Sequence, residues 1–202
     1  DKSLYQPQTV SVFDYNKEGY KKLKISMMEY DRYMNQFLHC GFVAMEPDTK
    51  HVKAWVGDIS YDYWQYDKVA QSKRQPGSTF KLFVYTAAML AGKSPCDKLI
   101  DEPVNYKYDG GVWKPKNANG TYGGYAMTLK AAFAQSVNSI AAQVAQKVGI
   151  SNVAKCAHMM GIQSKLVEVP SLCLGSSEVS LLELVNAYTT IVSEGMYHSP
   201  VI

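Results

Sequence analysis

The sequence predicts an α+β fold, with hairpin patterns in its first third and helical patterns through most of the remainder. Up to residue 57, apolar and polar residues alternate around short turns, as they do in half-buried strands. From residue 78 onward, apolar residues recur at helical spacing. Such chains place their helices on one side of an antiparallel sheet. The 202 residues, 47% hydrophobic and 19% charged, suffice for one globular domain with a sizeable core.

The first elements expected are a hairpin and a helix. Residues 9–13 alternate as a strand does, and residues 20–25 can pair with them around a turn at residues 16–19. Residues 26–38 then carry apolar side chains along one helical stripe. We interpret residues 1–39 as a linker segment of strands and an amphipathic helix, which precedes the main domain.

A second hairpin is expected next. Residues 41–46 and 51–57 are apolar runs joined by a turn that contains proline and aspartate. An aromatic stretch follows, and it could form a platform for a ligand. We favour a loop that packs on its own aromatic side chains. The aromatic residues of this stretch are Tyr61, Tyr63, Trp64 and Tyr66.

Helical patterns fill the rest of the chain. The pattern at residues 78–91 is apolar nearly all round, which predicts a helix buried in the centre of a domain. Residues 105–125 are rich in glycine, asparagine and tyrosine and are expected to form a loop. Two helical stretches follow at residues 128–148 and 153–160. A capping box at residues 180–183 opens a last helix, which should stop before residue 195.

Charge and cysteine usage exclude several functions. A net charge of +3 with scattered lysines argues against nucleic-acid binding. The cysteines lack the close pairing of a zinc site and the density of a disulfide scaffold, so we interpret them as small apolar fillers. A bridge between the last two is conceivable, but no pattern supports it. The four are Cys40, Cys96, Cys156 and Cys173.

No apolar run approaches the roughly 18 residues of a membrane span, and no signal peptide opens the chain.

The chemistry starts at Ser78 and Lys81, which stand three residues apart at the start of the apolar helix. This spacing puts both side chains on one face, where the lysine amine can approach the serine oxygen. A serine hydroxyl needs a base beside it, and burial would lower the lysine pKa toward the required range. The helix N-terminus also offers free N–H groups to a developing oxyanion. A capping serine with a lysine that extends to solvent would produce the same four-residue pattern.

Two further features favour the catalytic interpretation. Pro76 and Gly77 force a sharp turn immediately before Ser78, which would expose the serine at the helix end. Ser136 and Asn138 interrupt a helical region further along the chain, although a polar helix boundary would look alike. Taken together, Ser-x-x-Lys and Ser-x-Asn resemble the signature of penicillin-binding proteins and related β-lactamases.

The wider context resembles the transpeptidase domain of class A (bifunctional) penicillin-binding proteins over roughly residues 40–202. The similarity includes the run at residues 73–81 around the serine and the hairpin at residues 43–57. It also includes Trp113-x-Pro115-x-Asn117, the Leu174-Gly175 pair and the residues around the capping box.

The resemblance implies a penicillin-binding protein/serine β-lactamase-like fold, in which an antiparallel sheet is flanked by helices and a helical subdomain. It implies a D,D-transpeptidase that cross-links peptidoglycan stem peptides ending in D-Ala-D-Ala, and a target of β-lactams. Ser78 would be the nucleophile, with its N–H as half of the oxyanion hole, and Lys81 the base. Ser136 would relay a proton to the leaving group, and Asn138 would bind the substrate amide and hold Lys81. No metal or organic cofactor is implied.

The third motif of the signature, Lys-Thr-Gly, does not occur in the 202 residues. We therefore expect residues 40–202 to be the N-terminal part of the transpeptidase domain, cut from a longer parent, and the isolated piece to be impaired. The resemblance implies that this parent carries an upstream glycosyltransferase domain and a membrane anchor. It would act on the extracytoplasmic (periplasmic) face of the bacterial inner membrane.

Two alternatives stay open. Class D β-lactamases and related β-lactam-sensing domains can also carry Ser-Thr-Phe-Lys, but valine is the third residue of their second motif, where this chain has Asn138. A non-catalytic cell-wall scaffold, or pseudoenzyme, would account for the missing third motif. The scaffold alternative would not explain why the complete catalytic set is present. This set is Ser78, Lys81, Ser136 and Asn138.

Overall fold

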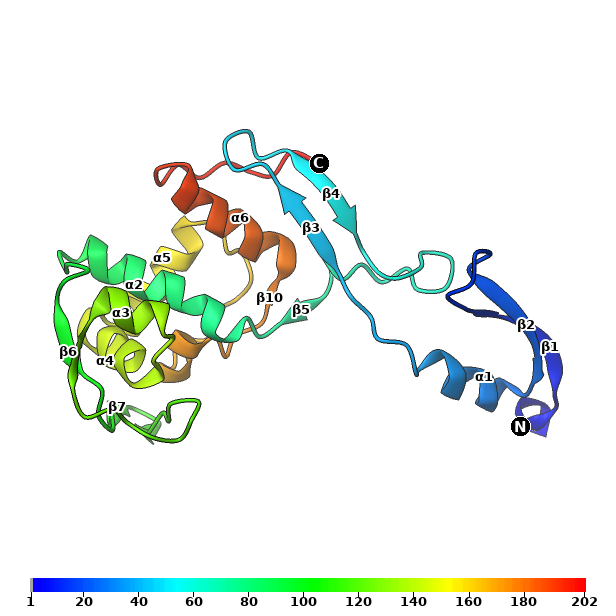
Figure 1. Ribbon diagram of the computed structural model, residues 1–202, viewed down its shortest axis with the longest axis horizontal. Coiled ribbons are helices and arrows are strands. Elements are labelled where there is room, and N and C mark those ends of the chain that lie inside the picture. The colour runs from blue at the N-terminus through cyan, green and yellow to red at the C-terminus, as the bar shows by residue number, and fades with distance from the viewer. Residues whose placement is uncertain (1) are drawn as a thin grey trace.

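The computed structural model describes residues 2–202, with side chains from Leu4 onward. Its helical part and its N-terminal strands lie at opposite ends, and the β3–β4 hairpin lies between them (Figure 1). Two hydrophobic clusters correspond to these ends. The larger one is built on the helices, and the smaller one surrounds Val12, Phe13 and Met34.

The N-terminal end is a hairpin followed by a short helix. After a 3-10 turn at Lys2–Tyr5, β1 (Gln8–Phe13) pairs antiparallel with β2 (Tyr20–Ile25), which confirms the predicted hairpin. Helix α1 spans Met27–Met34 and starts at a capping box made by Ser26 and Glu29. It ends four residues earlier than predicted, because the chain turns after Asn35 and brings Phe37 against Phe13 at a centroid distance of 5.0 Å.

The aromatic stretch packs mainly on the N-terminal end rather than on itself. The Trp64 ring lies 5.3 Å from that of Phe13 and 5.8 Å from that of Phe37. The Tyr63 hydroxyl bonds to the Ser11 hydroxyl at 2.9 Å. Within the stretch, Tyr63 and Trp64 also pack on each other at 5.9 Å, whereas Tyr61 and Tyr66 are exposed, so the predicted self-packed loop holds for that pair alone.

The predicted second hairpin is confirmed as β3 (Phe42–Met45) and β4 (Val52–Val56). Its turn places Lys50 in the left-handed region, with φ of 61°, and buries the side chain. The Lys50 amine donates to the hydroxyls of Thr189, at 3.0 Å, and Ser193, at 2.7 Å. These bonds attach the hairpin to helix α6 (Leu181–Val192).

The helical part is organised around the predicted buried helix. It begins as a 3-10 turn, η2 (Gly77–Phe80), and continues as α2 (Lys81–Leu90), with Phe80, Phe83 and Val84 fully buried. The surrounding helices are α3 (Leu129–Ala134), α4 (Asn138–Val148), α5 (Ile150–Met159) and α6, with η3 (Pro170–Leu174) beside them. The predicted helix at residues 128–148 is thus two helices, separated by residues 135–137.

Three short antiparallel strand pairs complete the helical part. These are β5 (Lys73–Arg74) with β10 (Val179–Ser180), β6 (Lys98–Ile100) with β9 (Ala126–Thr128), and β7 (Tyr106–Tyr108) with β8 (Gly111–Trp113). Residues 105–125 therefore include a small hairpin that the loop prediction missed, because its strands are only three residues long. Helices with small antiparallel sheets confirm the α+β class.

The prediction for the cysteines holds for two of them. Cys156 and Cys173 are buried, and burial raises the pKa of the Cys156 thiol to about 11 and that of Cys173 to about 12. Cys40 and Cys96 are exposed on connecting segments, so they are not core fillers. All four thiols are free.

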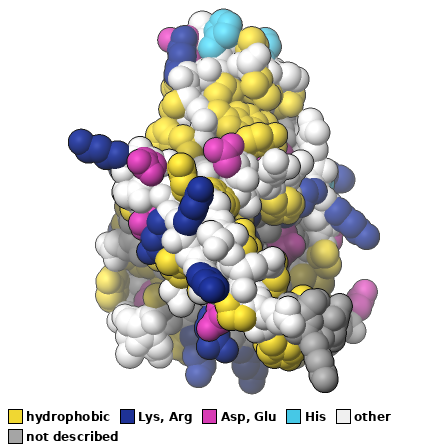
Figure 2. Space-filling model, turned by 90° about the vertical axis from the view of Figure 1, so that its right-hand side faces the viewer, with side chains coloured by type: hydrophobic (Ala, Val, Ile, Leu, Met, Phe, Trp, Pro, Cys, Tyr) yellow, Lys and Arg dark blue, Asp and Glu magenta, His cyan; other side chains and the backbone are white. Residues whose placement is uncertain are grey.

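The surface at the N-terminal end carries charges of both signs. Figure 2 shows lysine and arginine side chains spread over this face, some of them neighbours at its lower edge, together with acidic and hydrophobic side chains. Across residues 2–202, no helix combines the length and the apolar composition that crossing a membrane requires.

Glu183 joins α6 to the preceding segments. Its carboxylate accepts hydrogen bonds from the N–H groups of Ser180, Gln163 and Ser164, and from the hydroxyls of Ser180 and Ser164. Burial raises the pKa of this carboxyl, but these hydrogen bonds outweigh burial, so the pKa lies below its usual value.

We expect Glu183→Gln to lower the free energy of unfolding by about 1–3 kcal/mol at pH 7, because the charge-assisted bonds are lost. Since the folded-state pKa is depressed, the charge stabilises the fold above the unfolded pKa and ceases to do so as pH falls through the folded value. The difference in the free energy of unfolding between the variant and the parent should therefore shrink at acid pH. Urea unfolding at pH 7 and pH 3 measures it, with exposed Glu178→Gln as the control. A gap that stays constant with pH would contradict this role.

Candidate active site

Two glycines set the turn that carries Ser78. Gly77 has φ of 58°, a conformation that side chains rarely adopt, and it directly precedes the serine in η2. Gly175, with φ of 76°, packs against the backbone of Gly77 so closely that a Cβ atom on it would overlap the Gly77 peptide. Ser78 is exposed as a result, at the start of a helix whose next turn is buried.

Lys81 is the buried member of the pair, with 1% of its surface exposed. Its amine donates three hydrogen bonds: to the Ser136 carbonyl at 2.7 Å, to the Ser136 hydroxyl at 2.9 Å and to Asn138 Oδ1 at 2.6 Å. The three predicted residues Lys81, Ser136 and Asn138 therefore meet. Ser78 lies one helical turn before Lys81. Within residues 2–202, however, the Lys81 amine forms no hydrogen bond to Ser78.

Burial has a direct chemical effect on Lys81. It lowers the pKa of the amine to about 8, against a smaller opposing effect of the neighbouring Cys173 thiol. At neutral pH an appreciable fraction of the amine is then uncharged, whereas an ordinary lysine is almost fully protonated. An uncharged amine can accept a proton, so Lys81 has the protonation behaviour of a general base.

Ser136 lies in the break between α3 and α4. It has φ of 55°, a left-handed conformation that costs energy for any residue other than glycine. The break is closed by bonds from the Ser136 N–H to Phe133 and from the Val137 N–H to Ala132. It turns both oxygens of Ser136 toward the Lys81 amine, so the polar interruption in the sequence is a defined turn rather than a simple helix boundary.

Asn138 is the first residue of α4, and both ends of its amide are engaged. The oxygen accepts from Lys81, and Nδ2 donates to the carbonyl of Lys116 at 2.8 Å. The segment around residues 115–123 thereby forms one wall of the site. A cavity of about 350 Å³ opens along this wall beside Ser136, Val137 and Tyr122.

A buried carboxylate that the sequence did not reveal holds this wall in place. Asp101 accepts from the Ser139 hydroxyl at 2.5 Å, from Asn117 Nδ2 at 2.8 Å and from the Gly123 N–H at 2.7 Å. Asn117 Oδ1 in turn accepts from the Ser139 N–H at 3.0 Å. Burial raises the pKa of the Asp101 carboxyl, but the three donors outweigh it and keep the pKa below its usual value. In the sequence, the run Trp113-x-Pro115-x-Asn117 was the one indication of this network, because it contains Asn117.

The arrangement suits covalent acyl transfer. An exposed hydroxyl lies at a helix start, and a buried amine of lowered pKa lies one turn further on. A second hydroxyl and an amide surround that amine. No cluster of three or more His, Cys, Asp or Glu side chains that could hold a metal ion occurs within the described part of the chain.

Comparison with known proteins identifies the family of this fold. The model of the penicillin-binding protein transpeptidase domain matches residues 40–202. Penicillin-binding protein 2D of Bacillus subtilis is 34% identical over 165 residues, which cover 81% of this chain and 24% of that protein. Penicillin-binding protein 1A of Rickettsia typhi is 36% identical over 160 residues, which cover 78% and 20%. The chain thus spans a quarter or less of the length of these relatives.

Solved structures agree with the sequence matches. Penicillin-binding protein 1A from Haemophilus influenzae superposes with a TM-score of 0.75 at 25% identity, over 96% of this chain and 34% of that one. The PonA1 protein from Mycobacterium tuberculosis in complex with penicillin V gives a TM-score of 0.68 at 25% identity, over 79% of this chain and 45% of that one. The penicillin-binding protein fold predicted from the sequence is confirmed.

We expect Asp101→Asn to lower the free energy of unfolding by about 2–3 kcal/mol, because the replacement amide cannot accept all three hydrogen bonds and leaves buried donors unpaired. Chemical denaturation at pH 7 measures the loss. The matched control is Asp109→Asn, at an exposed position of the same region, which should stay within about 0.5 kcal/mol of the parent. Equal stability of the two variants would show that Asp101 does not organise the wall.

Proposed function

The chain belongs to the transpeptidase domain family of penicillin-binding proteins, and on that premise we propose that it carries the acylation machinery of a serine-type D,D-transpeptidase. Its donor substrate would be a peptidoglycan stem peptide ending in D-Ala-D-Ala. The observation that carries the proposal is the buried Lys81 amine, bonded to Ser136 and Asn138 one helical turn after Ser78.

In the acylation step, Ser78 Oγ attacks the carbonyl carbon between the two D-alanines, and the uncharged Lys81 amine takes the hydroxyl proton. The carbon–nitrogen bond of the peptide breaks, and an ester to Ser78 forms. The departing D-alanine nitrogen needs a proton, which passes from the Lys81 ammonium through the Ser136 hydroxyl. The 2.9 Å bond between these two groups supports this relay.

In the second step an amine from a neighbouring stem peptide attacks the ester carbonyl. A new amide bond forms, Ser78 Oγ leaves, and the amine proton returns through Lys81 to the serine oxygen. Asn138 holds Lys81 through Oδ1 in both steps and would also bond the substrate amide. The Ser78 N–H at the start of η2 supplies one donor to the oxyanion. No Lys-Thr-Gly triplet occurs in this sequence, so a second donor is not assigned to any of its residues.

β-Lactams would be alternative acyl donors, because their strained amide presents a carbonyl to the same serine. The PonA1 relative, solved with penicillin V, is consistent with this assignment. We further propose that residues 40–202 form part of the transpeptidase domain and residues 1–39 a linker. The whole protein would be membrane-anchored, with a glycosyltransferase domain upstream, and would act on the extracytoplasmic side of the bacterial inner membrane.

We expect intact-mass spectrometry after exposure to benzylpenicillin to show a gain of one drug molecule, absent from Ser78→Ala. The control Ser60→Ala removes a serine outside the site and should acylate as the parent does. An adduct that persists in Ser78→Ala would overturn the assignment of the nucleophile. An adduct that hydrolyses within seconds would favour the β-lactamase alternative, and a folded chain that forms no adduct even when extended past Ile202 would favour the scaffold.

We expect the acylation rate to depend on the protonation of Lys81. Below the pKa of about 8 the uncharged fraction falls tenfold per pH unit, so the rate at pH 6 should be roughly tenfold below that at pH 7. Above pH 9 the rate should level off. Stopped-flow kinetics with a chromogenic cephalosporin measures the profile. Lys81→Arg, which keeps a positive charge but cannot act as a base, should lose about 10²-fold or more of the rate. A flat profile between pH 6 and 9 would exclude Lys81 as the base.

A further inference from the structure

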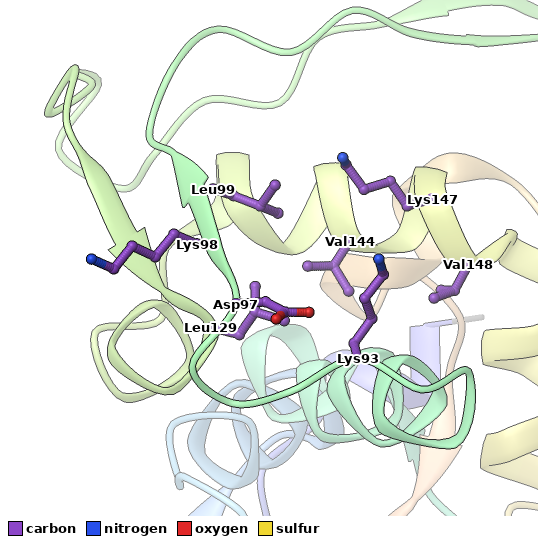
Figure 3. A pocket seen from close by; sticks show the side chains of 8 residues that line it. All are labelled: Lys93, Asp97, Lys98, Leu99, Leu129, Val144, Lys147 and Val148. Atoms are coloured by element: carbon purple, nitrogen blue, oxygen red, sulfur yellow. The ribbon is translucent and has the colours of Figure 1, made fainter.

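A second cavity, of about 370 Å³, lies outside the candidate active site (Figure 3). It is enclosed by the segment after α2, the first residues of β6, the start of α3 and the last turn of α4. Helix α2 begins with Lys81 and α4 begins with Asn138, whereas the cavity is lined by residues after the end of α2 and by the last turn of α4. Along α4 it is therefore about 9–15 Å, or six to ten helical residues, from Asn138.

The inner wall of the cavity is apolar. Leu129 and Val144 are buried, with 2% and 3% of their surfaces exposed, and Leu99 and Val148 are partly buried beside them. Figure 3 shows Leu99 and Val144 between α4 and the strand that carries Leu99, with Val148 toward the other end of the helix. A cavity of about 370 Å³ with an apolar inner wall falls within the size range of small-molecule binding sites.

Charged side chains stand at the mouth. Lys93 rises from the segment after α2 toward α4, and Lys147 extends from the last turn of α4, whereas Lys98 points away from the cavity (Figure 3). Neither Lys93 nor Lys147 forms an ion pair within the part of the chain that the structure describes. Asp97 also faces the mouth, but its Oδ2 accepts the Ser94 N–H at 3.1 Å and so caps the local turn. The two amines leave an excess of positive charge above an apolar wall.

We propose that this cavity binds a small amphipathic monoanion. Its acidic group would lie between Lys93 and Lys147, and its short apolar body would cover Leu129 and Val144. An anion satisfies both amines at once, and the apolar body removes the exposed part of the wall from water. The same lysines complement the negative ends of α2 and α4. If the two lysines only stabilised the helix ends, the cavity would show no saturable binding of an anion. A binding experiment therefore separates this structural role from the proposed site.

The test uses hexanoate as the probe and methyl NMR of the whole chain as the readout. Hexanoate should shift the methyl resonances of Leu99, Leu129, Val144 and Val148 in a saturable way, with a Kd in the millimolar range. Three comparison ligands isolate the contributions: 1-hexanol lacks the charge, hexylammonium reverses it, and acetate lacks the apolar body. Each should bind several-fold more weakly than hexanoate. Hexanesulfonate should bind as hexanoate does, because the proposed recognition requires only a single negative charge on an apolar body.

Variants supply the second part of the test. The double variant Lys93→Gln/Lys147→Gln should weaken hexanoate binding about tenfold, since each exposed ion pair contributes about three- to fivefold. The matched control Lys107→Gln/Lys165→Gln removes two exposed lysines elsewhere and should bind hexanoate as the parent does. Equal affinity for hexanoate and 1-hexanol, unchanged binding by the first double variant, or shifts spread over other surfaces would each overturn the proposal. Penicillin acylation should be the same in both variants, so failure here is distinguishable from failure of the transpeptidase assignment.

Discussion

The structure depends on one interaction, the burial of the Lys81 amine among three oxygen acceptors from the turn at residues 136–138. A lysine in an apolar helix loses hydration, and this loss lowers its pKa to about 8. The acceptors offset part of the cost, because they satisfy the three N–H groups of the charged form. The same environment therefore stabilises the packing of α2 against α4 and makes the amine available as a base.

Other features of the helical part serve to hold this geometry. The left-handed turn at Ser136 directs two of the acceptors, and Asp101 fixes the segment that holds the Asn138 amide. On the opposite side, the close approach of Gly175 to Gly77 leaves Ser78 exposed while Lys81 is buried. Strain and buried charge are thus concentrated where acyl transfer is proposed, which is where folded proteins commonly retain them.

Local sequence patterns predicted much of the fold and the pair Ser78 and Lys81, whereas Ser136 and Asn138 were predicted from the resemblance to the family signature. Both long hairpins and the capping box at Ser180 follow from residues close together in the chain. Asp101 could not be found in this way, because its partners lie 16 to 38 residues away and nothing in its local sequence indicates them. The same holds for Lys50, whose partners Thr189 and Ser193 are 139 and 143 residues distant. The exposed positions of Cys40 and Cys96 likewise follow from tertiary structure and not from residue type.

The most direct test of the account is an NMR titration of the lysine side-chain amines, with the Lys81 signal assigned by its absence from Lys81→Arg. The account predicts that Lys81 titrates near pH 8, well below the ordinary pKa of an exposed lysine. The prediction is specific to burial, so the signals of the exposed lysines as a group serve as the internal reference. A Lys81 signal that titrates together with this reference would contradict the central claim that burial prepares this amine to act as a base.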